Sequence, residues 1–199
     1  YFARICNQFV GNAFYSPTNA ITILAPFLFK ELVSSDLIHE PLLSHAIIAH
    51  ELFHSMFTSA SSTLIDVYGK RGECLKDHYS KTCSSFGKGR CARHGFTIYE
   101  DGADAEGWRL LYDLFEKDHS DQLDQPMGVN GITLHQAYFY FTSISWCQDK
   151  RVGHRVEDKH SSGHVRVNGV VSLMPEFSRA FKCKKEDRMY TEEKKCQIF

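Results

Sequence analysis

The stretch that decides the fold is an H-E-x-x-H pattern inside an apolar run: Ile47-Ile48-Ala49-His50-Glu51-Leu52-Phe53-His54. On an α-helix, residues four positions apart lie on the same face, so His50 and His54 can direct two imidazoles at one metal ion. Glu51 lies beside them, where a carboxylate can take a proton from an activated water. The spacing is the one used by zinc proteases, whose metal takes three protein ligands and leaves a fourth position open. The stretch therefore predicts two zinc ligands and requires a third.

The alternative interpretation of this stretch is a buried helix that carries two histidines without a metal. The run from Pro41 to Phe57 is apolar nearly all round, which is typical of a buried helix. Buried imidazoles and carboxylates need hydrogen-bond partners or a metal ion. The combination of burial and spacing favours zinc.

A second helical pattern, over residues 96–119, offers the third ligand. Glu100 and Asp104 fall on the same stripe of this helix as its apolar residues, although ionised carboxylates are rarely buried without a cation or donors. We expect Glu100 to be the third zinc ligand and Asp104 to accept the free ring N–H of a zinc-bound histidine. The alternative is a surface pair of carboxylates on an amphipathic helix, which their place on the apolar stripe disfavours.

The remaining pattern predicts a mainly helical chain with a small β component, an α+β fold. Helices are expected over residues 20–33 (bent near Pro26), 41–58, 73–80, 96–119, 132–146 and 174–183. Strands are expected over residues 6–15 and 165–167, with Ser16–Asn19 as a helix-initiating turn and loops over residues 34–40, 66–72, 84–94, 120–131 and 148–163.

Composition excludes some partners. A net charge of −1 over 199 residues gives no support to a nucleic-acid partner, which needs a basic surface. No apolar run reaches the roughly 18 residues expected of a membrane span. The chain begins with Tyr1, and we interpret it as a fragment or a processed piece, from which targeting information is expected to be missing.

The seven cysteines are scattered, an odd number without a C-x-x-C pair, so a structural zinc site is not expected. The spread favours disulfides in an oxidising compartment, with at least one partner cysteine outside this chain. Cys83 and Cys91 are placed to close the loop between them. Reduced, buried thiols are the alternative.

Four segments share their order with one enzyme family. They are Asn12-Ala13-Phe14-Tyr15, the H-E-x-x-H stretch, Glu100-Asp101-Gly102-Ala103-Asp104, and the H-S-x-x-x-x-R-x-x-G segment from His160 to Gly169. Together with Pro175-Glu176-Phe177 and Cys196 near the end, they resemble the catalytic domain of the neprilysin and endothelin-converting enzyme family of zinc metalloendopeptidases. The resemblance covers nearly the whole chain.

The resemblance implies a zincin-type (thermolysin-like) catalytic domain spanning residues 1–199, the C-terminal part of a protein whose N-terminal lobe is not in this chain. It implies one Zn²⁺ bound by His50, His54 and Glu100. It also gives roles to four further residues. His160 stabilises the developing oxyanion, Arg166 holds a substrate carbonyl, and Asn12 and Ala13 bind the peptide backbone like an added strand.

The resemblance also implies the cysteine pairing and the location. Cys74 is expected to pair with Cys196. Cys147 and Cys183 are expected to bridge to cysteines in the N-terminal lobe. An extracellular location follows, either secreted or as the ectodomain of a type II membrane protein.

The chain departs from the family in two places. Ser55-Met56-Phe57-Thr58 follows the zinc helix where the family has a Gly-Phe-Asp segment, and the family's Trp pair is absent. Asp101, Gly102, Ala105 and Glu106 also differ from the family pattern. The leading hypothesis is a zinc-dependent endopeptidase that cleaves short peptides with Glu51 as base. The second is a catalytically weak or inactive secreted relative acting as a peptide-binding or decoy protein, and the third is an unrelated zinc hydrolase.

Overall fold

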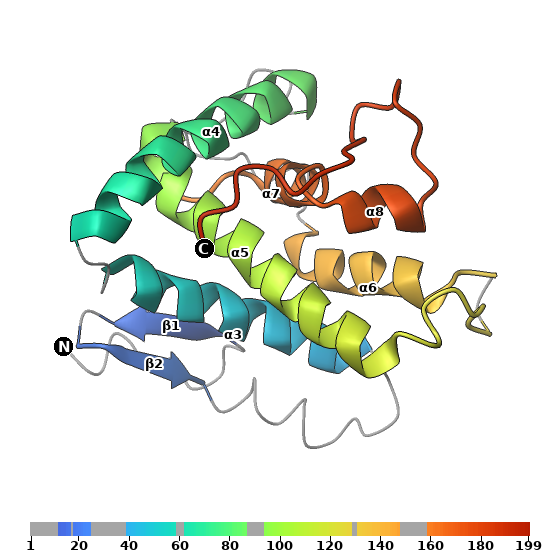
Figure 1. Ribbon diagram of the computed structural model, residues 1–199. Coiled ribbons are helices and arrows are strands. Elements are labelled where there is room, and N and C mark those ends of the chain that lie inside the picture. Colours follow the sequence, from blue (N-terminus) through green and yellow to red (C-terminus); the bar gives the residue numbers. More distant parts are fainter. Residues whose placement is uncertain are drawn as a thin grey trace.

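The computed structural model describes residues 12–16, 18–24, 39–58, 62–86, 94–128, 131–147 and 159–199. In chain order the elements are β1 (Ala13–Ser16), β2 (Ala20–Ile23), α3 (His39–Thr58), α4 (Ser62–Phe86), α5 (His94–His119), α6 (Leu134–Ser143), the 3-10 turn η1 (Ile144–Trp146), α7 (Gly163–Val171) and α8 (Pro175–Ala180). Figure 1 shows α5 running through the middle, with α3 and the β1–β2 hairpin below it and α4 and α7 above. The fold is mainly helical with a small two-stranded sheet, which confirms the predicted class.

The helix with the H-E-x-x-H pattern forms as predicted. It is observed as α3, and its buried face repeats every three to four residues at Leu42, Ala46, Ala49 and Phe53. This face packs against α5, the other helix predicted to carry site residues. Residues 100–109 of α5 are all buried, so the expected burial of its carboxylates is confirmed.

The backbones of α3 and α5 come close at Gly107. A Cβ placed there would lie 3.0 Å from the backbone nitrogen of His50. Since backbone cannot move aside as a side chain can, any larger residue at this position pushes the two helices apart. Gly107 therefore sets how closely α5 approaches α3.

We expect Gly107→Ala to lower the free energy of unfolding by about 1–3 kcal/mol, the usual cost of overpacking a core. The matched control is Gly69→Ala on α4, where an added Cβ meets nothing within 4 Å. That change should raise stability by about 0.5–1 kcal/mol through helix propensity alone. Chemical denaturation of both variants checks the pair. A Gly107→Ala protein as stable as the control would contradict the close approach.

Three further helices confirm their predictions. α5, α6 with η1, and α8 were expected at residues 96–119, 132–146 and 174–183. A capping box between Thr133 and Gln136 starts α6, and Pro175 occupies the first turn of α8. Their aromatic residues build the larger core with α3 and α7, centred on Trp108, Tyr112, Tyr138 and Phe139.

The helix expected over residues 20–33 is wrong at its start. Residues 20–23 form strand β2, which pairs antiparallel with β1. The preceding polar residues make a hairpin turn, in which the Asn19 N–H donates to the Ser16 carbonyl and Asn19 adopts a φ of 58°. The rest of that helix, and residues 6–11 of the expected first strand, lie outside the described residues.

Two further predictions are wrong, that of a loop at residues 66–72 and that of a strand and a turn at residues 165–169. α4 is one continuous helix through residues 66–72, and α7 is a helix where a strand and a turn were expected at residues 165–169. The cause is tertiary packing between the two helices. A side chain at Gly169 would overlap the ring of Tyr79, which is fully buried on α4. Gly169, which weakens helix propensity in isolation, is here a point of contact between the two helices.

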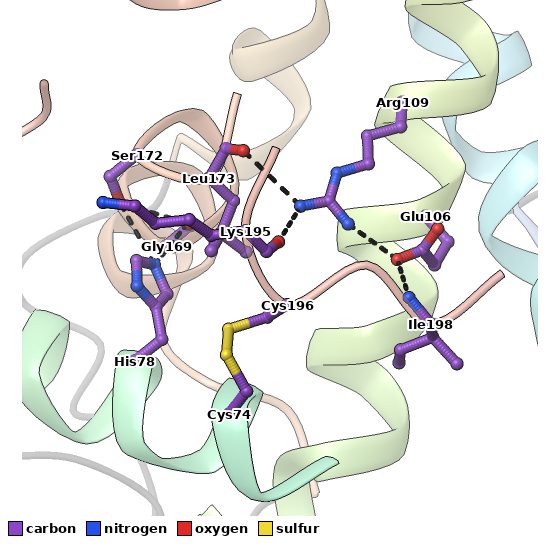
Figure 2. The surroundings of a disulfide bond; sticks show 10 residues. All are labelled: Cys74, His78, Glu106, Arg109, Gly169, Ser172, Leu173, Lys195, Cys196 and Ile198. Atoms are coloured by element: carbon purple, nitrogen blue, oxygen red, sulfur yellow. Dashed lines mark hydrogen bonds and ion pairs between the residues drawn. A yellow bond between two sulfur atoms is a disulfide. The ribbon is translucent and has the colours of Figure 1, made fainter. Parts of the chain in front are cut away.

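The last residues of the chain are held against the helices, as Figure 2 shows. The predicted disulfide between Cys74 and Cys196 is confirmed and links this segment to α4. The Glu106 carboxylate accepts the Ile198 N–H at 2.9 Å and pairs with Arg109 at 2.7 Å. Arg109 also donates to the Lys195 carbonyl. Residues 195–198 are therefore fixed by a buried ion pair as well as by a covalent bond.

The other cysteine predictions remain predictions. Cys83 is disulfide-bonded, and its expected partner, Cys91, lies outside the described residues. Cys147 and Cys183 form no disulfide within the part of the chain that the structure describes. Within the same ranges, no helix is both long and apolar enough to cross a membrane.

Candidate metal centre

The three predicted zinc ligands meet at the crossing of α3 and α5. His50 and His54 lie one turn apart on α3, with their Nε2 atoms 2.9 Å from each other. The Oε2 atom of Glu100 on α5 lies 3.2 Å from the His50 Nε2 and 3.1 Å from the His54 Nε2. Three candidate ligand atoms from two helices thus form a compact triangle.

This triangle fits a zinc ion. Tetrahedral zinc binds imidazole nitrogen and carboxylate oxygen at about 2.0–2.2 Å, which puts ligand atoms roughly 3.3 Å apart. The observed separations of 2.9–3.2 Å are close to that value. Two imidazoles and one carboxylate at these separations are a donor set that zinc uses in catalytic sites.

Asp104 lies behind His50, as predicted. Its Oδ1 is 2.7 Å from the Nδ1 of His50, the ring nitrogen that points away from the triangle. The same carboxylate forms two bonds with the Arg166 guanidinium, at 2.6 Å to Nε and 2.7 Å to Nη2. Asp104 is 1% exposed, so this contact is a buried, bidentate ion pair. The arrangement fixes the ring of His50 and the side chain of Arg166 together.

His160, expected to act on the oxyanion, lies at the mouth of the site. Its Nε2 is 3.3 Å from the Glu100 Oε2, and its side chain is 42% exposed. Arg166 rests on the face of Trp146, with 3.9 Å between its Cζ and the ring centroid. Arg166 lies on α7, and His160 lies in the turn before it. The packing of α7 on α4 and α5 positions both residues at the site.

Charge pairing controls the protonation of the centre. Burial disfavours the charged forms of both His50 and Asp104. For His50, the attraction of Asp104 and hydrogen bonds to Asp104 and Glu100 outweigh burial, although the charge on Arg166 disfavours protonation. For Asp104, the charges on Arg166 and His50 outweigh burial. The pKa of His50 rises to about 9 and that of Asp104 falls to about 2. Burial likewise opposes ionisation of Glu100, yet hydrogen bonds from His160, His50 and His54 hold its pKa well below the usual range. At neutral pH and without metal, the His50 imidazole is therefore positively charged. It must lose one of its two ring protons before it can bind zinc.

We expect zinc binding at pH 7 to release about one proton from His50, because only the neutral imidazole binds the metal. The raised pKa means that His50 stays protonated up to about pH 9, so the release fades as the pH rises through that value. Titration calorimetry in two buffers of different ionisation enthalpy measures the released proton directly. An apparent binding enthalpy that is the same in both buffers at pH 7 would contradict the prediction.

Glu51 faces the hairpin from α3. One of its carboxylate oxygens lies within 4.8 Å of the ligand nitrogens of His50 and His54. Its Oε2 accepts a hydrogen bond of 2.7 Å from the backbone N–H of Tyr15 on β1. At the start of the same strand, the side chain of Asn12 accepts the Ala13 N–H at 2.9 Å. The strand expected to bind peptide backbone thus runs beside the expected base.

The structure brings the predicted site residues into one region, and it adds two groups that the sequence did not reveal. These are the Trp146 ring under Arg166 and the backbone N–H of Tyr15 against Glu51. The sequence does not indicate either contact. Trp146 and Arg166 are 20 positions apart with no helical or strand spacing between them, and the Tyr15 N–H is a main-chain group that every non-proline residue has. Beyond His54, where the sequence departs from the family, Phe57 packs with Tyr68, Tyr99 and Phe199.

Comparison with known proteins identifies relatives of this arrangement. The profile of peptidase family M13 matches residues 12–198. Neprilysin-3 of Drosophila melanogaster is 26% identical over 94% of this chain and 26% of its own length. Human neprilysin is 28% identical over 53% of this chain and 14% of its own length. The chain thus spans about a quarter of the Drosophila relative.

Two solved structures share the fold. A Haemonchus galactose-containing glycoprotein complex superposes with a TM-score of 0.77, at 21% identity, over 94% of this chain and 35% of that chain. The Mycobacterium tuberculosis zinc metalloprotease Zmp1, solved in complex with an inhibitor, gives a TM-score of 0.70, also at 21% identity, over 92% of this chain and 32% of its own. The mainly helical architecture around the two crossed helices is therefore shared across distant sequences.

Proposed function

Because this chain belongs to peptidase family M13, we propose that it carries the active site of a zinc-dependent endopeptidase that hydrolyses short peptides. One observation carries the proposal. The Nε2 atoms of His50 and His54 and the Oε2 of Glu100 lie 2.9–3.2 Å apart, with a Glu51 carboxylate oxygen within 4.8 Å of the two nitrogens. Ligands and base together are what peptide hydrolysis by an activated water requires.

We assign one Zn²⁺ to His50, His54 and Glu100. Bound there, the ion supplies a Lewis acid that polarises the scissile carbonyl and increases the acidity of water. Asp104 holds His50 by its Nδ1, which fixes the ring with Nε2 toward the ligand triangle.

The chain's own residues move the proton and stabilise charge. Glu51 accepts a proton from the attacking water and returns it to the leaving amine. His160 is exposed enough to donate to the oxygen that gains charge. Arg166 uses Nε and Nη2 for Asp104, which leaves Nη1 as the guanidinium nitrogen for a substrate carbonyl.

The peptide is assigned to the edge of β1 that faces away from β2. An extended substrate added there would lie beside the metal centre, with Asn12 and Ala13 holding its backbone. Recognition through backbone groups accounts for peptides of varied sequence. The apolar surroundings of α3 favour a hydrophobic side chain just after the cleaved bond.

The whole protein is proposed to be larger and extracellular. The relatives are several times longer than this chain, and we infer an N-terminal lobe that encloses the site and limits substrates to short peptides. That lobe would hold the disulfide partners of Cys147 and Cys183. A secreted protein or the ectodomain of a membrane protein provides the oxidising surroundings that these bonds need.

Metal analysis combined with cleavage mapping tests the proposal. The purified protein should bind one zinc per chain and cut short peptides internally, with products identified by mass spectrometry. A chelator should abolish cleavage, and added zinc should restore it. A protein that binds zinc and peptides but leaves every peptide intact would overturn the proposal and favour a peptide-binding or decoy relative.

A further inference from the structure

The register of the hairpin determines which backbone groups of β1 face the metal centre. The Leu24 N–H donates to the Asn12 carbonyl at 2.9 Å, which makes residues 12 and 24 a hydrogen-bonded pair. Bonded and non-bonded pairs alternate in an antiparallel ladder. Tyr15 lies opposite Ile21 in a non-bonded pair, so its N–H and carbonyl point away from β2.

This outward N–H of Tyr15 meets the Glu51 carboxylate. The hydrogen bond is 2.7 Å long, joins residues 36 apart, and connects β1 to α3. It is a hydrogen bond to a carboxylate, a strong kind that is also short. The N–H of Ala13 also points away from β2, and it donates a hydrogen bond to the Asn12 side chain.

A glutamate side chain has three rotatable bonds, and holding it in one orientation costs entropy. An amide within a paired strand is itself fixed, so it can hold one carboxylate oxygen in place without ordering anything further. The other oxygen can then accept the proton without the side chain having to be ordered first. Orientation of this kind raises the rate of a step without tightening substrate binding.

We propose that the backbone N–H of Tyr15 is a positioning group for Glu51, so that the strand that binds the peptide also sets the orientation of the base. The inference rests on the proposed peptidase function. It also restricts the substrate, because the Tyr15 amide is occupied by Glu51. An added peptide must then pair with β1 through other backbone groups.

The test replaces the amide between Phe14 and Tyr15 with an ester, by incorporating the α-hydroxy acid analogue of tyrosine into the full-length, zinc-loaded protein. This removes one N–H and keeps every side chain. We expect kcat for a short peptide to fall about tenfold or more, as for a lost hydrogen bond to a charged group, with KM changed less than about twofold. Zinc content should stay at one per chain.

The matched control is the same ester at Ile21, the partner of Tyr15 in the register. That N–H points away from β1, and both esters weaken one carbonyl of the hairpin ladder equally. The Ile21 ester should keep kcat within about twofold, because no site residue depends on its N–H. Equal losses from the two esters would overturn the inference.

Two further measurements separate positioning from folding. In a Glu51→Gln background, the Tyr15 ester should cause no further loss in the residual rate, because its effect passes through Glu51. A further loss equal to that in the unmodified protein would overturn the inference, as would loss of zinc by the Tyr15 ester alone. If the unmodified protein itself cleaves nothing, the proposed function fails and the inference falls with it. If the unmodified protein and the Tyr15 ester are equally active, the inference about Tyr15 fails while the proposed function stands.

Discussion

Replacing Glu51 with glutamine is expected to lower kcat for peptide hydrolysis by about 10²–10⁴-fold, the usual contribution of a general base. The amide is the same size as the carboxylate and can still accept the Tyr15 N–H, but it cannot take a proton from water. The metal ligands on α3 and α5 are untouched, so zinc should remain at one per chain. Steady-state kinetics on one peptide, with metal analysis of the same sample, measures both quantities.

The control for this change is Glu73→Gln on the exposed side of α4, which removes only a surface pair with Lys76. It should leave kcat within about twofold, since exposed ion pairs contribute little. Equal activity of the Glu51→Gln and unmodified proteins would remove Glu51 from the role of base. Equal inactivity, with zinc bound to both, would instead remove the peptidase function.

Asp104→Ala is expected to lower the free energy of unfolding of the zinc-free protein by about 3–5 kcal/mol, the cost of leaving one charge of a buried pair alone. Arg166 is 8% exposed, and both of its bonds to Asp104 would be lost. The change also removes the acceptor at the Nδ1 of His50, so zinc affinity should fall about 10–100-fold. Chemical denaturation and a zinc competition assay measure the two effects.

Acid should reduce the difference between this variant and the unmodified protein. The pKa of Asp104 is lowered to about 2, so its stabilising contribution is complete above the ordinary aspartate pKa of about 3.9 and is lost as the pH falls through 2. The control is Asp113→Ala on the same helix, an exposed residue paired with Lys194, which should cost at most about 1 kcal/mol. Similar losses from the two substitutions would contradict the buried ion pair.

The parts of the fold that could be predicted are those specified locally. The apolar run around His50 and His54 predicted α3, and their four-residue spacing predicted that both side chains lie on one face of it. Glu100 was found because a carboxylate on an apolar stripe calls for a cation. The helix expected over residues 73–80 is part of α4, but the helical structure of residues 66–72 and of α7 was not predicted. Gly169 and the glycines of α4 disfavour helix in isolation, and Val165-Arg166-Val167 alternates like a strand. Tertiary packing, such as that of Tyr79 on Gly169, favours helix in both segments, and that contact spans 90 residues of sequence.

The site divides in a similar way. Spacing and burial predicted the ligand residues, and the resemblance supplied His160, Arg166 and the disulfide of Cys74. The sequence did not reveal that Arg166 binds the same carboxylate that supports His50, since the two residues lie 62 positions apart. That link means that the proposed substrate-binding side chain, Arg166, and a proposed metal ligand, His50, are held by one buried carboxylate.

The docking of residues 195–199 determines when the site can be completed during synthesis. The ring of Phe199 packs on Phe53 and Phe57 of α3, with centroids 5.6 and 5.5 Å apart, and Arg71 donates to the Ile198 carbonyl at 2.9 Å. These contacts join residues more than 120 positions apart. They can form only after residue 199 has been synthesised, and closing so long a loop costs chain entropy. α3 therefore emerges well before residues 195–199 can pack on it. During that interval the apolar, histidine-bearing helix lacks this support, which exposes apolar surface to aggregation.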